Sequence, residues 1–168
     1  MTEYPHKQKS PTIDKTAFIA DSAKVMGDVT IGAESNIWFG TVIRGDVHEI
    51  VIGERTNIQD NSVVHVSHEF SGTYIGSDVT IGHGCIIHAC TIMDRSFIGM
   101  GSIVMDKALV EEHAMLAAGS LLTPNKTVPS GELWGGRPAK FMRKLTDDDI
   151  KHFTWSAKHY VKLANTYK

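Results

Sequence analysis

The chain has 168 residues, enough for one domain with a hydrophobic core, and its 17 basic and 19 acidic residues give a formal net charge of −2. This balance excludes a basic nucleic-acid-binding surface and a polybasic membrane-binding segment, and no apolar run approaches the roughly 20 residues that span a membrane. Residues 1–11 lack the hydrophobic region of a signal peptide, and Cys85 and Cys90 are interpreted as small core residues of a protein in the reducing cytoplasm.

From residue 19 to residue 122, an aliphatic residue recurs every six positions, and a small residue follows most of these four positions later. The aliphatic residues form four runs: Ile19 to Ile43, Ile52 to Val64, Ile75 to Ile87 and Ile92 to Leu122. A period of six fits neither an α-helix nor simple strand alternation, but it fits a short strand followed by a tight turn. Three such units close a triangular coil, and coils stack at the strand spacing. The sequence therefore predicts a mainly β fold, a parallel β-helix of hexapeptide repeats over about residues 12–125.

Three irregular spacings interrupt the repeat. The interval from Ile43 to Ile52 holds three extra residues, the interval from Val64 to Ile75 holds five, and the interval from Ile87 to Ile92 is one residue short. The five extra residues predict a loop around residues 67–73.

The repeat stops after Leu122. Residues 126–145 are rich in Pro and Gly and are expected to form a loop. Residues 146–167 predict an amphipathic C-terminal helix, with Thr146 as its N-cap, Asp149 at the capping-box position and acidic residues in the first turn. Its apolar face is expected to lie on the β-helix or on a neighbouring subunit, so residues 1–168 are interpreted as a single domain.

The hexads can be assigned in turn to three faces, A, B and C, beginning with face A at residue 19. Because strand side chains alternate, the residue after each inward aliphatic residue points outward. On face B this places Arg44, His65 and His88 in one column on successive coils, where two imidazoles one strand spacing apart can share a metal. On face A, Asp60 and His83 form a second column, so one chain alone is not expected to bring the three histidines together.

A threefold trimer would set face B of one subunit against face A of the next. His65 and His88 would then meet His83 of the neighbour, and one coil earlier Arg44 would pair with Asp60. Three neutral histidines with an open fourth position are the ligand set of a hydrolytic or hydratase zinc site, where the metal lowers the pKa of bound water towards about 7. The sequence thus predicts a metal site between the subunits of a homotrimer.

Seven motifs resemble those of the γ-class carbonic anhydrases and their bacterial relatives. They span nearly the whole chain: "VIRGD" at 42–46, "TNIQD" at 56–60, "SVVH" at 62–65, "IGHG" at 81–84, "IIHAC" at 86–90, "IGMGS" at 98–102 and "GRPAK" at 136–140. The resemblance implies a left-handed β-helix with a C-terminal helix, assembled as a homotrimer with metal at the subunit interfaces. The implied activity is reversible CO₂ hydration by metal-bound hydroxide, with CO₂ and bicarbonate as substrates.

The resemblance also implies a role for each site residue. The residues that match the metal ligands, for Zn(II) or in some preparations Fe(II) or Co(II), are His65, His83 and His88. The residues that match those holding the trimer and ordering the site are Arg44, Asp46 and Asp60. Asn57 and Gln59 match residues that hydrogen-bond the bound water or bicarbonate, and Gln59 is positioned to orient the hydroxide.

The chain departs from the archetypal member at the acidic loop that carries a glutamate proton shuttle. Here residues 67–73 form only a short segment, which contains His68 and Glu69. Val47 stands where that member has a second glutamate after the "RGD" aspartate. Glu69 or His68 is the candidate replacement shuttle, and ordinary loop polarity is the competing interpretation.

Three other functions fit the same scaffold. Some relatives hydrolyse acyl-CoA thioesters, and attack on a thioester carbonyl needs the same activated hydroxide. Hexapeptide acyltransferases typically use one catalytic histidine and no metal, and the register of three histidines argues against this function. A binding or assembly protein with a catalytically weak site is the remaining alternative.

Overall fold

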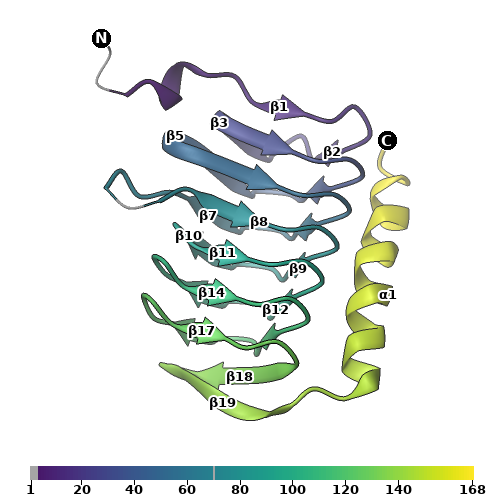
Figure 1. Ribbon diagram of the computed structural model, residues 1–168. Helices are drawn as coiled ribbons and strands as arrows, with labels where there is room; N and C mark the ends of the chain where they lie inside the picture. The colour runs from purple at the N-terminus through teal and green to yellow at the C-terminus, as the bar shows by residue number, and fades with distance from the viewer. Residues whose placement is uncertain (1–3, 70) are drawn as a thin grey trace.

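The computed structural model describes residues 4–69 and 71–168, and it is a stack of triangular β coils with one helix alongside (Figure 1). A short 3-10 helix, η1 (His6–Gln8), precedes the first coil. Stacked strands pair in parallel, and the inward aliphatic residues lie in register from coil to coil, as between Ile43 and Val64 and between Ile58 and Ile81. The prediction of a mainly β, parallel hexapeptide β-helix is therefore confirmed.

Each face of the triangle is a column of short strands. Face A consists of β2 (Phe18–Ile19), β4 (Asn36–Ile37), β6 (Asn57–Ile58), β9 (Thr80–Ile81), β12 (Phe97–Ile98), β15 (Met115–Leu116) and β18 (Glu132–Gly136). Face B consists of the first halves of β3 (Lys24–Ile31) and β5 (Val42–Ile52), then β7 (Val63–His65), β10 (Ile86–His88), β13 (Ile103–Val104) and β16 (Leu121–Leu122). Face C consists of β1 (Thr12–Ile13), the second halves of β3 and β5, then β8 (Thr73–Ile75), β11 (Thr91–Ile92), β14 (Leu109–Val110) and β17 (Thr127–Val128).

The core is the column of aliphatic side chains inside the triangle, and small residues close its corners. Ile37, Ile58 and Ile98 are fully buried, as a hydrophobic interior requires. The corner hydroxyls are buried too, and they donate to carbonyls of the next coil: Ser35 Oγ to Gly53 O at 2.7 Å and Thr41 Oγ1 to Gln59 O at 2.9 Å. A small polar residue therefore fits a corner because it fills little space and pairs its own hydroxyl.

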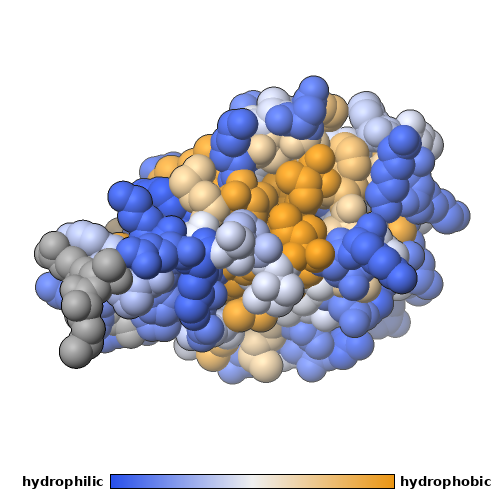
Figure 2. Space-filling model, turned by 90° about the horizontal axis from the view of Figure 1, so that it is seen from above, coloured by the Kyte–Doolittle hydropathy of each residue, from blue (hydrophilic) through white to orange (hydrophobic). Residues whose placement is uncertain are grey.

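The N-terminal end of the stack is less completely covered than its middle. Ile19 and Val25 of the first coil are half-buried, whereas Ile37 and Ile43 of the next coil are fully buried. Seen down the stack from this end, apolar side chains gather at the centre within a hydrophilic rim (Figure 2).

The irregular spacings are accommodated in two different ways. The extra residues after Ile43 form a bulge within β5, because its pairing with β3 shifts register from Gly27–Gly45 to Val29–Ile50 where the strands pass from face B to face C. Gly27 and Gly45 permit this close pairing, since a Cβ on Gly27 would lie 2.3 Å from the Gly45 carbonyl oxygen. The predicted loop at 67–73 is present among the described residues, where Ser67 N donates to Ser71 O at 3.1 Å.

The prediction of a loop over residues 126–145 is wrong. This segment contains β17 and β18, which continue faces C and A, and β19 (Ala139–Lys144), which returns antiparallel to β18. Val128 is fully buried, and Trp134, in register with the inward residue Leu116, packs against the core. The Pro and Gly residues that suggested a loop include the turn between β18 and β19, so their composition marks a hairpin rather than the end of β structure.

The predicted C-terminal helix is α1 (Asp147–Ala164), which ends at Ala164 rather than at residue 167. Its capping box is present as predicted, because the Thr146 side chain accepts from Asp149 N and the Asp149 side chain accepts from Thr146 N. The helix runs back along face A towards the first coils (Figure 1). Phe153 stacks on Phe97 with ring centroids 5.2 Å apart. No helix within residues 4–69 and 71–168 is long and apolar enough to cross a membrane.

Candidate metal centre

His65 and His88 are neighbours on the outside of face B. They pair in register on β7 and β10, and their ring centroids are 5.3 Å apart. Arg44 lies one coil earlier in the same column, because Ile43 pairs with Val64. The column predicted from the hexad register is thus present.

A carboxylate from the same chain holds each of these two imidazoles. His65 Nε2 lies 3.0 Å from Asp46 Oδ1, and the other oxygen of Asp46 pairs with Arg44. His88 Nδ1 lies 2.5 Å from Asp106 Oδ1. These contacts orient the rings and leave His65 Nδ1 and His88 Nε2 as the nitrogens available to a ligand.

Asp106 was missed by the sequence reasoning. Its signal was present in the register, because Asp106 follows the inward residue Val104 by two positions on the coil directly after His88. On face B the hexad assignment considered only the residue directly after each aliphatic residue, although on face A it used the second residue, as for Asp60 and His83. The residue directly after Val104 is Met105, so the adjacent carboxylate was overlooked.

His83 lies on face A, where Asp60 of the preceding coil holds it. His83 Nδ1 is 2.7 Å from Asp60 Oδ2, which leaves Nε2 free to face outward from a half-exposed side chain. This second column also matches the register prediction. Among the described residues of one chain, no three His, Cys, Asp or Glu side chains converge as a metal site. A site that uses all three histidines therefore requires a second copy of the chain.

The charges around His65 favour the protonation states that metal binding needs. Burial lowers the pKa of His65, and the positive charge of Arg44 lowers it further against the opposing effect of Asp46. Burial acts to raise the pKa of Asp46, but the hydrogen bonds from His65 and Arg44 outweigh it and the net shift is downward. A neutral imidazole beside an ionised carboxylate is the state in which histidine binds a metal.

Asn57 and Gln59 lie beside this site on face A, and both are buried. Gln59 Nε2 donates to Asn57 Oδ1 at 3.0 Å, and Asn57 Nδ2 donates to Thr80 Oγ1 at 2.9 Å. Gln59 thus shows one polar end to Asn57 and the other to the space outside the coil.

A groove of about 540 Å³ runs between face A and α1, and it joins Gln59 and His83 to the helix. The residues that line it from the helix are His152, Trp155, Ser156, His159 and Tyr160. His152 and His159 stack on either side of Trp155, with centroids 5.5 and 4.7 Å from it. The spacing of His152, Trp155 and His159 places all three on one helical face.

The described residues of the loop at 67–73 do not line this groove. Glu69 and His68 are exposed on the segment that follows β7, and neither lines the groove. A shuttle role for Glu69 stays a prediction.

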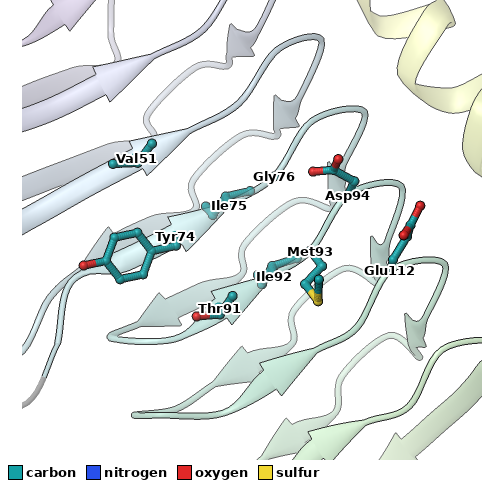
Figure 3. Close-up of a pocket in the computed structure, with 9 residues that line it drawn as sticks. All are labelled: Val51, Tyr74, Ile75, Gly76, Thr91, Ile92, Met93, Asp94 and Glu112. Carbon is teal, nitrogen blue, oxygen red and sulfur yellow. The ribbon is translucent and has the colours of Figure 1, made fainter.

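A second, smaller pocket of about 260 Å³ lies on face C and contains none of the predicted site residues (Figure 3). Its lining includes Tyr74, Met93, Asp94 and Glu112. Each histidine of the candidate metal centre lies on another face, so this pocket is separate from the site.

Comparison with known proteins shows close relatives over almost the whole chain, although no family model matches it. The chain is 54% identical over 164 residues, 95% of its length, to the mitochondrial γ carbonic anhydrase 2 of Arabidopsis thaliana, of which it covers 59%. The chain thus spans about three-fifths of the length of that plant relative. It is 48% identical to a carbonic anhydrase of Geobacillus kaustophilus, covering 98% of this chain and 90% of that one. A solved structure of a hexapeptide transferase family protein from Anaplasma phagocytophilum matches with a TM-score of 0.91 and 57% identity, over 94% of this chain and 93% of that one.

Proposed function

The chain belongs to the γ-carbonic anhydrase family, and we propose that it binds a divalent metal between subunits and interconverts CO₂ and bicarbonate. One observation carries this proposal. His65, His83 and His88 each have one ring nitrogen on a carboxylate of their own chain and the other nitrogen free. That arrangement fixes the tautomer and orientation of histidine ligands in metal proteins.

The donor set fits Zn(II), and Fe(II) or Co(II) are compatible with the same imidazoles. A metal held by three neutral histidines lowers the pKa of a coordinated water towards about 7, and so supplies hydroxide at neutral pH. Asp46, Asp60 and Asp106 keep the three rings in place, and their negative charge increases the basicity of the rings they hold.

A homotrimer is proposed because two of the three ligands lie on face B and the third on face A. Large apolar side chains are exposed beside the histidines of face B, including Val63 at 39% and Ile86 at 43%. On face A, Met100 is 56% exposed next to the groove. Contact between these faces would cover apolar surface and bring His83 of one subunit to His65 and His88 of the next.

Within the chain, Arg44 already pairs with Asp46 and Asp60 with His83. The predicted pairing of Arg44 with Asp60 across the interface would add to these contacts. The Arg44–Asp60 pair would connect face B of one subunit to face A of the next, one coil away from the metal ligands. Because opposite charges attract, this pair would favour one alignment of the two subunits.

A metal held by these histidines would supply hydroxide for addition to the carbon of CO₂, and the proton lost when the next water is deprotonated would pass to solvent. Gln59 would accept a hydrogen bond from the hydroxide through Oε1 and so direct its oxygen lone pair towards CO₂. Asn57 holds Gln59 from behind at 3.0 Å. Glu69 or His68 of a neighbouring loop is the proposed proton acceptor.

The cytoplasmic location stays a prediction, because the Arabidopsis relative is named mitochondrial.

The test is stopped-flow CO₂ hydration by protein reconstituted separately with Zn(II), Co(II) and anaerobic Fe(II). His83→Ala is the control, because it removes one ligand from a half-exposed position without opening the core. Metal-dependent hydration that disappears in the control is the expected result. The absence of hydration with each bound metal would contradict the proposal.

The groove favours a second candidate, hydrolysis of acyl-CoA thioesters. Its volume of about 540 Å³ and its lining by Phe97, Met100, Met115 and Trp155 exceed what CO₂ needs and suit an apolar acyl group. Release of free thiol from acyl-CoA by metal-loaded protein, and its loss after chelation, would favour this activity. If both activities are absent while metal is bound, a binding or assembly role is the alternative that remains.

A further inference from the structure

Four polar side chains, buried between face A and α1, connect the helix to the candidate metal centre. Ser156 Oγ of α1 lies 2.9 Å from Thr80 Oγ1 of β9, which accepts from Asn57 Nδ2 at 2.9 Å. Asn57 Oδ1 accepts from Gln59 Nε2 at 3.0 Å. Ser156 and Thr80 are 76 residues apart in the sequence, so only the docking of the helix brings them together.

All four side chains are shielded from water. Asn57 and Thr80 are almost completely buried, and Ser156 and Gln59 are 4% and 5% exposed. Within the described part of the chain, no buried side-chain nitrogen or oxygen lacks a hydrogen-bond partner. Because solvent cannot replace a lost partner at these positions, removing the Thr80 hydroxyl takes the 2.9 Å bond from Asn57 Nδ2 and leaves it the longer bond to Val79 O at 3.3 Å.

The two amide groups in this series of side chains have the same orientation. Each amide nitrogen donates towards the helix, from Gln59 to Asn57 and from Asn57 to Thr80. Asn57 Nδ2 also donates at 3.3 Å to the backbone carbonyl of Val79, an atom that can only accept, and either hydroxyl of the Thr80–Ser156 pair can donate to the other. The Gln59 carboxamide therefore has its nitrogen turned inward and Oε1 as the atom that can face the groove.

The preceding coil supports this orientation independently. Asn36, which pairs in register with Asn57, accepts at Oδ1 from Trp38 Nε1 at 2.7 Å. An indole nitrogen can only donate, so the amide orientation of Asn36 is defined by chemistry. Asn57 accepts in the same way from the residue two positions further on.

We propose that Ser156 and Thr80 are positioning residues that hold Gln59 with its oxygen towards the reacting hydroxide. In the opposite orientation, the Gln59 NH₂ group would donate to the hydroxide and occupy the lone pair that attacks CO₂. The catalytic part of this inference rests on the proposed function, whereas the orientation of Gln59 does not. The C-terminal helix thus acts on the metal centre through the buried layer between α1 and face A, as well as covering that face.

The experiment compares Thr80→Val, which keeps the shape but removes the hydroxyl, with Thr80→Ser, which keeps the hydroxyl. Ser156→Ala tests the helix end of the relay, the hydrogen-bonded series Ser156, Thr80, Asn57 and Gln59. Ser96→Ala is the control, because the Ser96 side chain is equally buried but its Oγ donates to the carbonyl of Met93 and not to any of the four polar side chains. The first readout is the side-chain amide NMR signals of Gln59 and Asn57 in the metal-free protein, assigned with Gln59→Ala.

The second readout is CO₂ hydration by the reconstituted variants. Because Gln59 acts in the hydration step and not in proton release, Thr80→Val and Ser156→Ala should lower kcat/KM more than kcat. A single lost hydrogen bond corresponds to a loss of roughly fivefold to tenfold in kcat/KM. Thr80→Ser and Ser96→Ala should keep both the wild-type rate and the amide signals.

Amide signals that shift in Thr80→Val and Ser156→Ala, but not in Thr80→Ser or Ser96→Ala, would support the relay. Unchanged Gln59 signals in folded Thr80→Val and Ser156→Ala would overturn it, whatever the rates. If wild-type protein hydrates no CO₂, the proposed function fails and the amide signals still decide the orientation of Gln59. Thermal unfolding of each variant identifies any that fails to fold. If Thr80→Val fails to fold, Ser156→Ala is the milder change that still tests the relay.

Discussion

His65 and His88 lie ring beside ring, 5.3 Å apart, yet they are held by carboxylates from different coils. Asp46 holds His65 from the coil before it, and Asp106 holds His88 from the coil after it. The two rings are thus fixed from opposite directions, with one free nitrogen each. This pair is a partial ligand set that a third histidine from another subunit would complete.

A cross-subunit site predicts that two inactive variants complement each other. His83→Ala retains the ligands of face B, and His88→Ala retains the ligand of face A. In any mixed trimer, one of the three interfaces combines the intact halves, so metal content should recover to about a third of the wild-type value per trimer. The measurement is metal analysis of co-expressed, doubly tagged heterotrimers.

The control for complementation is a mixture of His65→Ala with His88→Ala subunits. Both changes lie on face B, so no interface contains all three ligands and no metal should be recovered. Equal recovery in the two mixtures would show that the ligands do not belong to facing columns.

Asp106→Asn should weaken metal binding without unfolding the coil. The amide can no longer balance the charge or fix the tautomer of His88, and loss of such a partner lowers metal affinity roughly 10–100-fold. The affinity is measured by competition with a chromophoric chelator. Asp94→Asn is the matched control, because Asp94 lies on face C and accepts only from the backbone of Ser77. Equal affinities in the two variants would remove Asp106 from the site.

Ile86→Asp should dissociate the proposed trimer into folded monomers. Ile86 is 43% exposed in the single chain, and covering this remaining surface at an interface stabilises the assembly by roughly 1 kcal/mol per subunit. A carboxylate there would lose this contribution and add the cost of burying a charge. Light scattering after size exclusion gives the oligomeric state.

Met93→Asp is the counterpart on face C, where Met93 is also 43% exposed. Since face C takes no part in the proposed contact, this variant should stay trimeric. Dissociation by Met93→Asp but not by Ile86→Asp would assign the interface to face C instead.

Asp149→Asn should destabilise the fold at neutral pH and lose its effect in acid. Hydrogen bonds from Arg143, and then from Thr146, lower the pKa of Asp149 in the folded state. Its contribution is therefore fully present above the unfolded pKa of about 3.9 and is lost as pH falls towards the folded value. Loss of such a cap costs roughly 0.5–2 kcal/mol at pH 7.

The measurement is the urea midpoint of wild type and variant at pH 7 and pH 3, where the difference should shrink. Asp148→Asn is the matched control on the same turn, because its contact with Lys151 is fully solvent-exposed and weak. A difference that grows in acid would show that Asp149 is not the ionised partner of Arg143.

The sequence by itself determined the coil, its three faces and the two outward columns of the candidate metal centre. It could do so because a period of six assigns each residue to a face and strand alternation turns each side chain inward or outward. The pairing of His65 with His88 and of Asp60 with His83 required no other information.

Only the tertiary structure decided where α1 lies and what its side chains reach. No period relates Ser156 to Thr80, because the helix position depends on packing such as that of Phe153 on Phe97. The hairpin of β18 and β19 was missed for a similar reason, since its residues pair antiparallel outside the repeat. The six-residue spacing defines contacts between neighbouring coils. The contacts of α1 and β19 with the β-helix depend instead on how their side chains pack against its outer surface.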